Sequence, residues 1–267
     1  ESNTELEDAE PFDLTNDFAL DGQWLDALLA GTADDDWRAL LQARGALPLG
    51  EVGALAFEGR QEKLEPLRAQ LAQDGDGYEP LDVRVELAPG LVLTGRLPRV
   101  SGTRQQVVTT ADKPFASLYL EAWLKHLALA ACAGPHAITA LYSLGKPAVL
   151  DAADLDPHAL LQDLIAVFDQ AQCAPLRLFP KSAWEYAQQY AKTEDAGAAL
   201  EKAAGRWRPE YRMEKQTPEA DDPSYRACFG HEADALDPPA FAALALRVFG
   251  PLRARLNAVS RGAEEDA

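Results

Sequence analysis

Basic residues are scarce in this chain. Only 25 lysines and arginines stand against 43 aspartates and glutamates, which gives a formal net charge of −18. Such an excess of negative charge repels nucleic acid at long range. We therefore expect any DNA contact to be local, through a basic patch, or to depend on a partner that carries the positive charge.

Cysteine and methionine are also rare. The three cysteines, Cys132, Cys173 and Cys228, are an odd number without a CxxC pair, so we expect reduced thiols of a cytosolic protein, with Cys132 in the core. No apolar run reaches the roughly 18 residues of a membrane span, and we expect no signal peptide. The chain begins at Glu1 and holds one methionine, Met213, which favours a fragment of a longer polypeptide.

Familiar catalytic motifs are missing. The sequence has no GxSxG, no P-loop and no GxGxxG, so acyl transfer and nucleotide binding have no support and we expect no cofactor. His231-Glu232 begins the zinc-protease pattern HExxH, but Ala235 stands where the second histidine belongs. The segment 74–77 resembles the start of a calcium loop, but its twelfth position is Val85 instead of glutamate.

The region from Leu81 to Leu144 holds the clearest pattern. Leu81–Leu87 alternates apolar and charged residues, Leu91–Val100 returns after a turn, and Arg104–Thr110 is rich in β-branched residues, so three strands are predicted. An apolar stripe at helical spacing then predicts a helix over 114–132, and 136–144 is typical of a fourth strand.

A helix over 50–73 precedes these strands, and the resulting order is helix, three strands, helix, strand. We therefore predict an α/β fold with a PD-(D/E)xK (restriction-endonuclease-like) core and added helices at both ends. Residues 1–16 form an acidic lead-in, 17–262 a single domain with its core at about 50–180 and a helical extension over 181–262, and 263–267 a tail. A fifth strand is predicted at Ala174–Pro180.

A PD-(D/E)xK nuclease needs an aspartate near the end of the second strand, then an acid, any residue and a lysine on the third, to hold Mg²⁺ and orient water. Here Pro98 stands on the second strand, and the third ends in Thr109 and Thr110. Asp112 and Lys113 are adjacent, so they cannot both face one metal from a pleated strand. We expect a nuclease-like core with no catalytic residues and no bound metal.

Two rival functions stay open. The first is an active metal-dependent nuclease whose acids come from elsewhere, such as Glu86 on the first strand or Glu121 on the helix. The second is a protein–protein module that never meets DNA.

Two basic segments are candidates for DNA contact. In the first, over residues 206–215, basic side chains that could contact phosphate alternate with aromatic rings that could stack on bases. In the second, over residues 96–104, three arginines flank a hairpin turn. The plain alternatives are that the arginines pair with nearby acids while Trp207 anchors a loop, and that the hairpin is an ordinary solvated face. His126, on the apolar stripe, is favoured as a core or interface histidine over a general base. The candidates are Arg206, Trp207, Arg208, Tyr211, Arg212 and Lys215, and then Arg96, Arg99 and Arg104.

Several segments resemble, in matching order, the C-terminal region of RecC, the gamma chain of the bacterial RecBCD helicase–nuclease (exodeoxyribonuclease V). The resemblance implies a nuclease-like domain that has lost its active site, packs against RecB-like and RecD-like subunits, and meets forked or single-stranded DNA in the cytoplasmic complex. No catalytic residue carries over. The segments are EPFDL (10–14), ARGALPLGEVGALAFE (43–58), LTGRLPRV (93–100), AWLKHLALAACAG (122–134), APLRLFP (174–180) and DDPSYRACFG (221–230).

Overall fold

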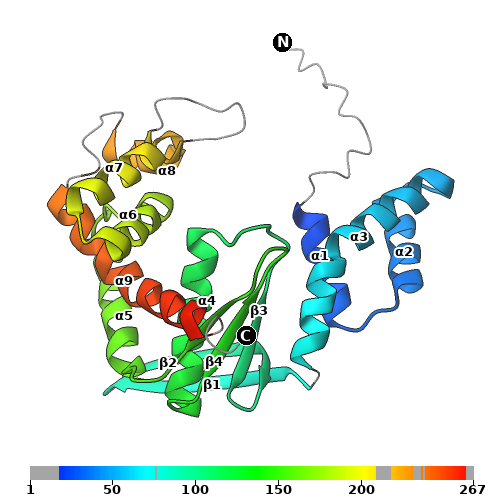
Figure 1. Cartoon of the computed structure of the whole chain (residues 1–267), viewed down its shortest axis with the longest axis horizontal. Helices are drawn as coiled ribbons and strands as arrows, with labels where there is room; N and C mark the ends of the chain where they lie inside the picture. Colours follow the sequence, from blue (N-terminus) through cyan, green and yellow to red (C-terminus); the bar gives the residue numbers. More distant parts are fainter. Residues whose placement is uncertain (1–17, 76, 209–217, 231–235, 237, 263–267) are drawn as a thin grey trace, which may run out of the picture. The chain divides into compact units, whose positions relative to one another are not determined.

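A computed structural model of the chain describes residues 18–75, 77–208, 218–230, 236 and 238–262 (Figure 1). These residues group into two compact units. The first takes the residues up to 75 together with 108–113 and 142–146, and the second takes 77–107, 114–141 and the described residues from 147 onward. Each unit is treated by itself below. No helix among the described residues combines the length and apolar character needed to cross a bilayer.

The first unit is built on three helices, α1 (Phe18–Leu29), α2 (Asp34–Ala43) and α3 (Gly50–Asp74). The Trp24 ring packs on Phe57 of α3 and edge-on to Trp37 of α2, with centroids 4.4 and 6.4 Å apart. Buried aromatic rings of this kind supply most of the apolar area that holds small helical clusters together. The three rings thus join all three helices.

A buried charge reinforces this packing. Asp21 of α1 is only 6% exposed and accepts hydrogen bonds from Arg60 and, at 2.9 Å, from Lys63 of α3. Removing one partner of such a buried pair typically costs about 3–5 kcal/mol, because the other charge stays buried and uncompensated.

The sheet has five strands in the order β1-β2-β3-β4-β5. The pairs β1–β2, β2–β3 and β4–β5 are antiparallel. Across β3 and β4, Ile138 donates to the Thr103 carbonyl oxygen (2.9 Å) and, farther along both strands, Thr109 donates to the Tyr142 carbonyl oxygen (3.0 Å), so these two strands run in the same direction. The bounds are β1 Glu79–Ala88, β2 Leu91–Ser101, β3 Arg104–Val108, β4 Ile138–Tyr142 and β5 Ala148–Asp151.

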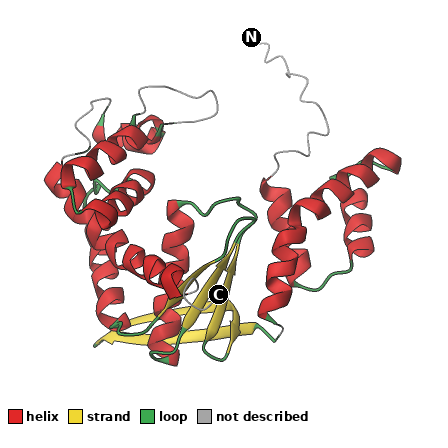
Figure 2. Cartoon of the chain, viewed as in Figure 1, coloured by secondary structure: helices red, strands yellow, loops and turns green. Residues whose placement is uncertain are grey.

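A parallel pair needs a crossover connection, and α4 (Ala116–Ala133) supplies it. Figures 1 and 2 show α4 lying along the sheet, and its buried stripe includes Ala122, Trp123 and Leu127. The predicted order of helix, three strands, helix and strand is therefore confirmed as α3, β1, β2, β3, α4 and β4.

Two predictions about local structure are wrong. Residues 174–179 form an irregular connection instead of a fifth strand; Leu176 and Leu178 alternate because both pack on the core of the second unit. The fifth strand is β5. Cys132, in the last turn of α4, is exposed and does not belong to the core.

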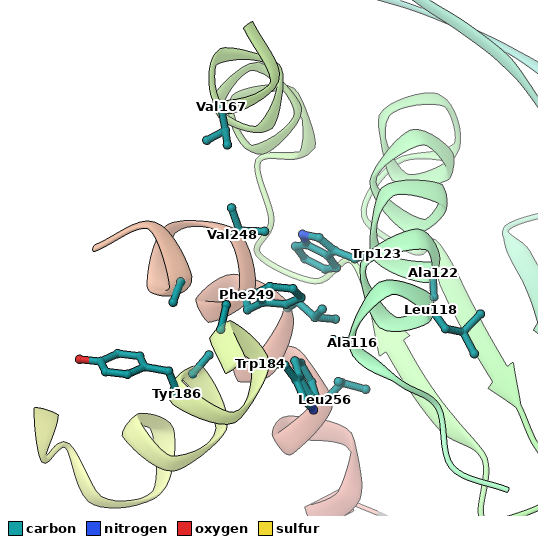
Figure 3. Packing of buried hydrophobic residues seen from close by; sticks show 14 of the residues in the cluster. Ala116, Leu118, Ala122, Trp123, Val167, Trp184, Tyr186, Val248, Phe249 and Leu256 are labelled. Atoms are coloured by element: carbon teal, nitrogen blue, oxygen red, sulfur yellow. The ribbon is translucent and has the colours of Figure 1, made fainter. Parts of the chain in front are cut away.

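The remaining helices build one aromatic-rich core with α4. Figure 3 shows Trp123, Trp184 and Phe249 directed toward a common centre, and the Trp184 ring stacks on Tyr119 at 4.6 Å. Full burial of a large apolar side chain contributes about 1.5–3 kcal/mol, so each of these rings stabilises the second unit. The helices are α5 (Pro157–Cys173), α6 (Pro180–Thr193), α7 (Ala196–Trp207), α8 (Pro223–Phe229) and α9 (Pro238–Gly262), with a 3₁₀ turn, η2, at Glu219–Asp221.

Candidate nucleic-acid interface

Pro98 lies in a β-bulge of β2. Glu79 pairs with Val100 and Leu81 with Leu97, so three steps along β2 face two steps along β1. Proline has no N–H for the ladder, and a bulge is one of the few places within a sheet that accepts it. The extra residue also turns both Leu97 and Val100 toward the buried face, where they are 4% and 7% exposed.

The chain after β3 is held by backbone hydrogen bonds. Thr109 donates its N–H to Tyr142 and accepts from the Ala111 N–H through its hydroxyl oxygen at 3.2 Å. Leu144 donates to the Ala111 carbonyl oxygen at 3.1 Å. Thr110 follows in this ordered segment, whereas Asp112 and Lys113 are exposed. No group of three or more His, Cys, Asp or Glu gathers as a metal site within the described ranges.

The two acids considered for a displaced active site lie on different elements. Glu86 is exposed on β1 opposite Val92. Glu121 is exposed on α4, where it forms an ion pair with Lys125 one turn away (2.5 Å).

His126 belongs to a buried polar cluster. Its Nδ1 lies 3.0 Å from the Thr139 hydroxyl, which donates to Gln105 Oε1 at 3.5 Å. Burial lowers the pKa of His126 to about 4, against the opposing effect of the Asp151 carbonyl oxygen and carboxylate. The side chain is 0% exposed, which confirms a core histidine, neutral at physiological pH.

The hairpin arginines are held differently from one another. Arg96 is exposed and pairs loosely with Asp82 of β1 at 3.6 Å. Arg99 donates from Nε and Nη2 to Gln106 Oε1 (3.0 and 2.8 Å), and its guanidinium lies 5.5 Å from the Tyr78 ring centroid. Arg104 is exposed at the start of β3. The side chains of Arg96 and Arg104 are therefore exposed to solvent, whereas that of Arg99 is half-buried.

The other candidates for DNA contact lie at and after the end of α7, and the described ones differ in how far they are exposed. Trp207 is 5% exposed and packs 4.2 Å from the Phe179 ring, so it is a core residue and offers no face to a base. Burial of this ring argues against its contact with DNA and favours the alternative in which Trp207 anchors the chain. Arg206 is half-buried and Arg208 is exposed. Tyr211, Arg212 and Lys215 lie outside the described residues.

The structure also contains an apolar groove of about 630 Å³ between β2, α4 and α5, which the sequence patterns did not predict. Gly95 lies on its strand side, where an added Cβ would approach nothing closer than Val83 at 3.9 Å. Leu124 and Phe168 line it from the two helices and are 41% and 61% exposed. Since these elements are far apart in the chain, no local signal could have revealed the groove.

These features define a class: an α/β domain with a mixed sheet, in which β2 carries a proline-bearing bulge and the chain after β3 carries threonines. The family described as RecC C-terminal domain matches residues 1–191, and the chain belongs to this family. The chain is also similar to the RecBCD enzyme subunit RecC of Mycolicibacterium smegmatis, with 31% identity over 169 residues, which are 60% of this chain and 15% of that protein. The resemblance noted in the sequence is thus confirmed, and the chain spans a small part of that relative's length.

Proposed function

We propose that this domain is a non-catalytic, nuclease-like part of a bacterial DNA double-strand-break repair helicase–nuclease in the cytoplasm. It acts there as a scaffold and as an element of the path along which the DNA strands separate. Family membership and the RecC relative support the parent assembly. The order α3, β1, β2, β3, α4, β4 supports a PD-(D/E)xK-like core.

One observation carries the non-catalytic part of the proposal. If the core is PD-(D/E)xK-like, as we propose, Pro98 in the β2 bulge and Thr109 and Thr110 after β3 stand where such an enzyme needs carboxylates and a lysine. Neither proline nor threonine supplies the negatively charged oxygen ligands that Mg²⁺ prefers. A nuclease reaction on this chain would have to use other acids.

The partners that we propose are RecB-like and RecD-like subunits, together with forked or single-stranded DNA inside the complex. A net charge of −18 suits a domain whose main partners are proteins. DNA contact is then confined to local cations, and Arg96, Arg104, Arg206 and Arg208 are the described candidates that reach solvent at least in part. Tyr211, Arg212 and Lys215 extend the second group along the sequence.

The DNA-path role is tested in the assembled enzyme. Reversal of Arg206, Arg208 and Arg212 to glutamate should slow the unwinding of forked DNA several-fold, because repulsion replaces attraction to phosphate. Lys192→Glu, an exposed charge reversal on α6, is the matched control and should leave unwinding unchanged. Normal unwinding by the triple variant would favour a module that contacts only proteins.

The nuclease alternative is tested separately. The protein is incubated with labelled forked DNA in Mg²⁺ and then in Mn²⁺, and we expect no cleavage above a buffer control. Cleavage that disappears in Glu86→Ala or Glu121→Ala would establish an active site built from those acids.

A further inference from the structure

The first two turns of α3 and the residue before them carry a patch of large apolar side chains on the surface. Leu49, Val52 and Leu55 are 78%, 67% and 69% exposed. Val52 and Leu55 are three residues apart on α3 and therefore neighbours on the helix surface, and Leu49 lies at the residue before the helix. A contiguous exposed patch of this kind marks an interaction site more often than scattered single apolar residues do.

The chain enters α3 through a tight turn next to this patch. Leu47 is buried at 2% exposure, while Gly50, with φ of +75°, turns the chain into α3. The Pro48 carbonyl oxygen then lies so close to Gly53 that an added Cβ would be 1.7 Å away. Leu49 is therefore presented by a turn whose backbone requires glycine at these two positions.

A row of carboxylates continues from the patch along α3. Glu58 follows Leu55 by three residues and Glu62 follows Glu58 by four, so all three lie on one face. The cations of the helix are used elsewhere, since Arg60 and Lys63 bind Asp21 and Arg68 binds Asp34. Over the described part of the chain, no ion pair reaches Glu58 or Glu62.

We propose that this face of α3, the α3 patch formed by Leu49, Val52, Leu55, Glu58 and Glu62, is a docking surface for another protein subunit of the parent assembly. The complementary surface has an apolar pocket for the three aliphatic side chains beside a row of lysines or arginines. The inference rests on the proposed function, because it takes the partner from the same helicase–nuclease.

The negative charge of the chain favours a basic protein surface over other occupants of the α3 patch. A second copy of the chain would bring carboxylates against carboxylates at a net charge of −18 for each copy, and nucleic acid or an anionic membrane would be repelled in the same way. A basic protein surface gains both the apolar burial and the ion pairs. An apolar centre beside charged residues is also the usual anatomy of an interface between subunits.

The test uses the full-length parent subunit and its purified partner subunits, with the dissociation constant measured by surface plasmon resonance. Leu49→Ser/Val52→Ser/Leu55→Ser should weaken association at least tenfold. Leu40→Ser, at a 39% exposed leucine on α2, is the matched control and should have no effect. The single variant Leu49→Ser is used in case the triple variant unfolds, because Leu49 precedes the helix and its side chain is exposed. This variant should weaken association several-fold.

A charge variant tests the second half of the surface. Glu58→Lys/Glu62→Lys should weaken association and reduce its dependence on salt, whereas Glu201→Lys on α7 should do neither. Unchanged affinity in Leu49→Ser and in Glu58→Lys/Glu62→Lys overturns the docking surface and leaves the proposed function standing. A wild-type subunit that fails to associate with the partner subunits at all overturns the proposed function itself.

Discussion

Ser182 and Glu219, 37 residues apart in the chain, are joined by two hydrogen bonds: the Ser182 N–H and hydroxyl both donate to Glu219 Oε2, at 2.8 and 2.7 Å. The Lys181 N–H donates to the other carboxylate oxygen at 2.9 Å. The buried Glu219 thus satisfies the free amides at the start of α6 from outside the helix, where a negative charge also interacts favourably with the helix dipole.

Loss of this carboxylate should destabilise the protein. Glu219→Gln leaves a similar shape but replaces charge-assisted hydrogen bonds by weaker ones, and we expect a loss of about 1–3 kcal/mol in the free energy of unfolding. Urea denaturation followed by circular dichroism measures this. The control is Asp221→Asn, which breaks an exposed pair with Arg226 and should change stability by less than about 1 kcal/mol.

His126 predicts a specific dependence of stability on pH. Its pKa is about 4 in the folded protein and about 6.5 in the unfolded chain. Between these pH values the imidazole is protonated in the unfolded chain but neutral in the folded protein. This group therefore costs the fold stability as the pH falls from about 6.5 to about 4. Between about pH 7.5 and pH 5 we expect a loss of about 2 kcal/mol from His126 alone.

The measurement compares urea denaturation at both pH values for wild type and His126→Gln. Because the other titrating groups are common to both proteins, the difference in pH dependence isolates His126. Equal losses of stability in the two proteins would show that the imidazole takes up its proton in the folded state as readily as in the unfolded state.

Two glycines of α3 should respond to alanine in opposite directions. Gly59→Ala adds a Cβ that meets nothing within 4 Å, and replacing glycine inside a helix should stabilise by about 0.5–1 kcal/mol. Gly53→Ala places a Cβ 1.7 Å from the Pro48 carbonyl oxygen, so the turn must open and the protein should lose stability. Thermal unfolding of the two variants checks the signs, and a stabilised Gly53→Ala would refute the close approach of Pro48.

Binding of the protein to duplex DNA should be weak and depend steeply on salt. With a net charge of −18, only local cations attract phosphate, and we expect a dissociation constant in the micromolar range or weaker at physiological salt. Fluorescence anisotropy at several salt concentrations measures this. Nanomolar affinity that persists at physiological salt contradicts a purely local contact.

Local patterns were enough to predict much of the fold. The alternation in β1 and the apolar stripe of α4 depend on neighbours in sequence, so both elements and their order could be predicted. β5 could not be predicted, because its four residues are too few to show a clear alternation of apolar and polar side chains. The sequence Ala174–Pro180 matches a strand pattern because Leu176 and Leu178 alternate with other residues. Both leucines pack on the core, but the segment is not part of the sheet.

The candidate site was less predictable because its geometry depends on distant residues. The bulge at Pro98 follows from the register between β1 and β2, which no single segment shows. Trp207 stands between two arginines in the sequence, yet Phe179 and Tyr225 bury its ring. His126 could be predicted as a core residue from its own helix, but its partners Thr139 and Gln105 could not.

The first unit is discontinuous along the chain, since residues 108–113 and 142–146 belong to it and Gln70 donates to the Gly145 carbonyl oxygen at 3.0 Å. During synthesis the three helices leave the ribosome well before these two segments, so the unit cannot be completed until residue 146 has been made. A gene fragment ending near residue 75 would encode an unfinished structure, and a protease cut after β4 would remove part of the first unit as well as most of the second.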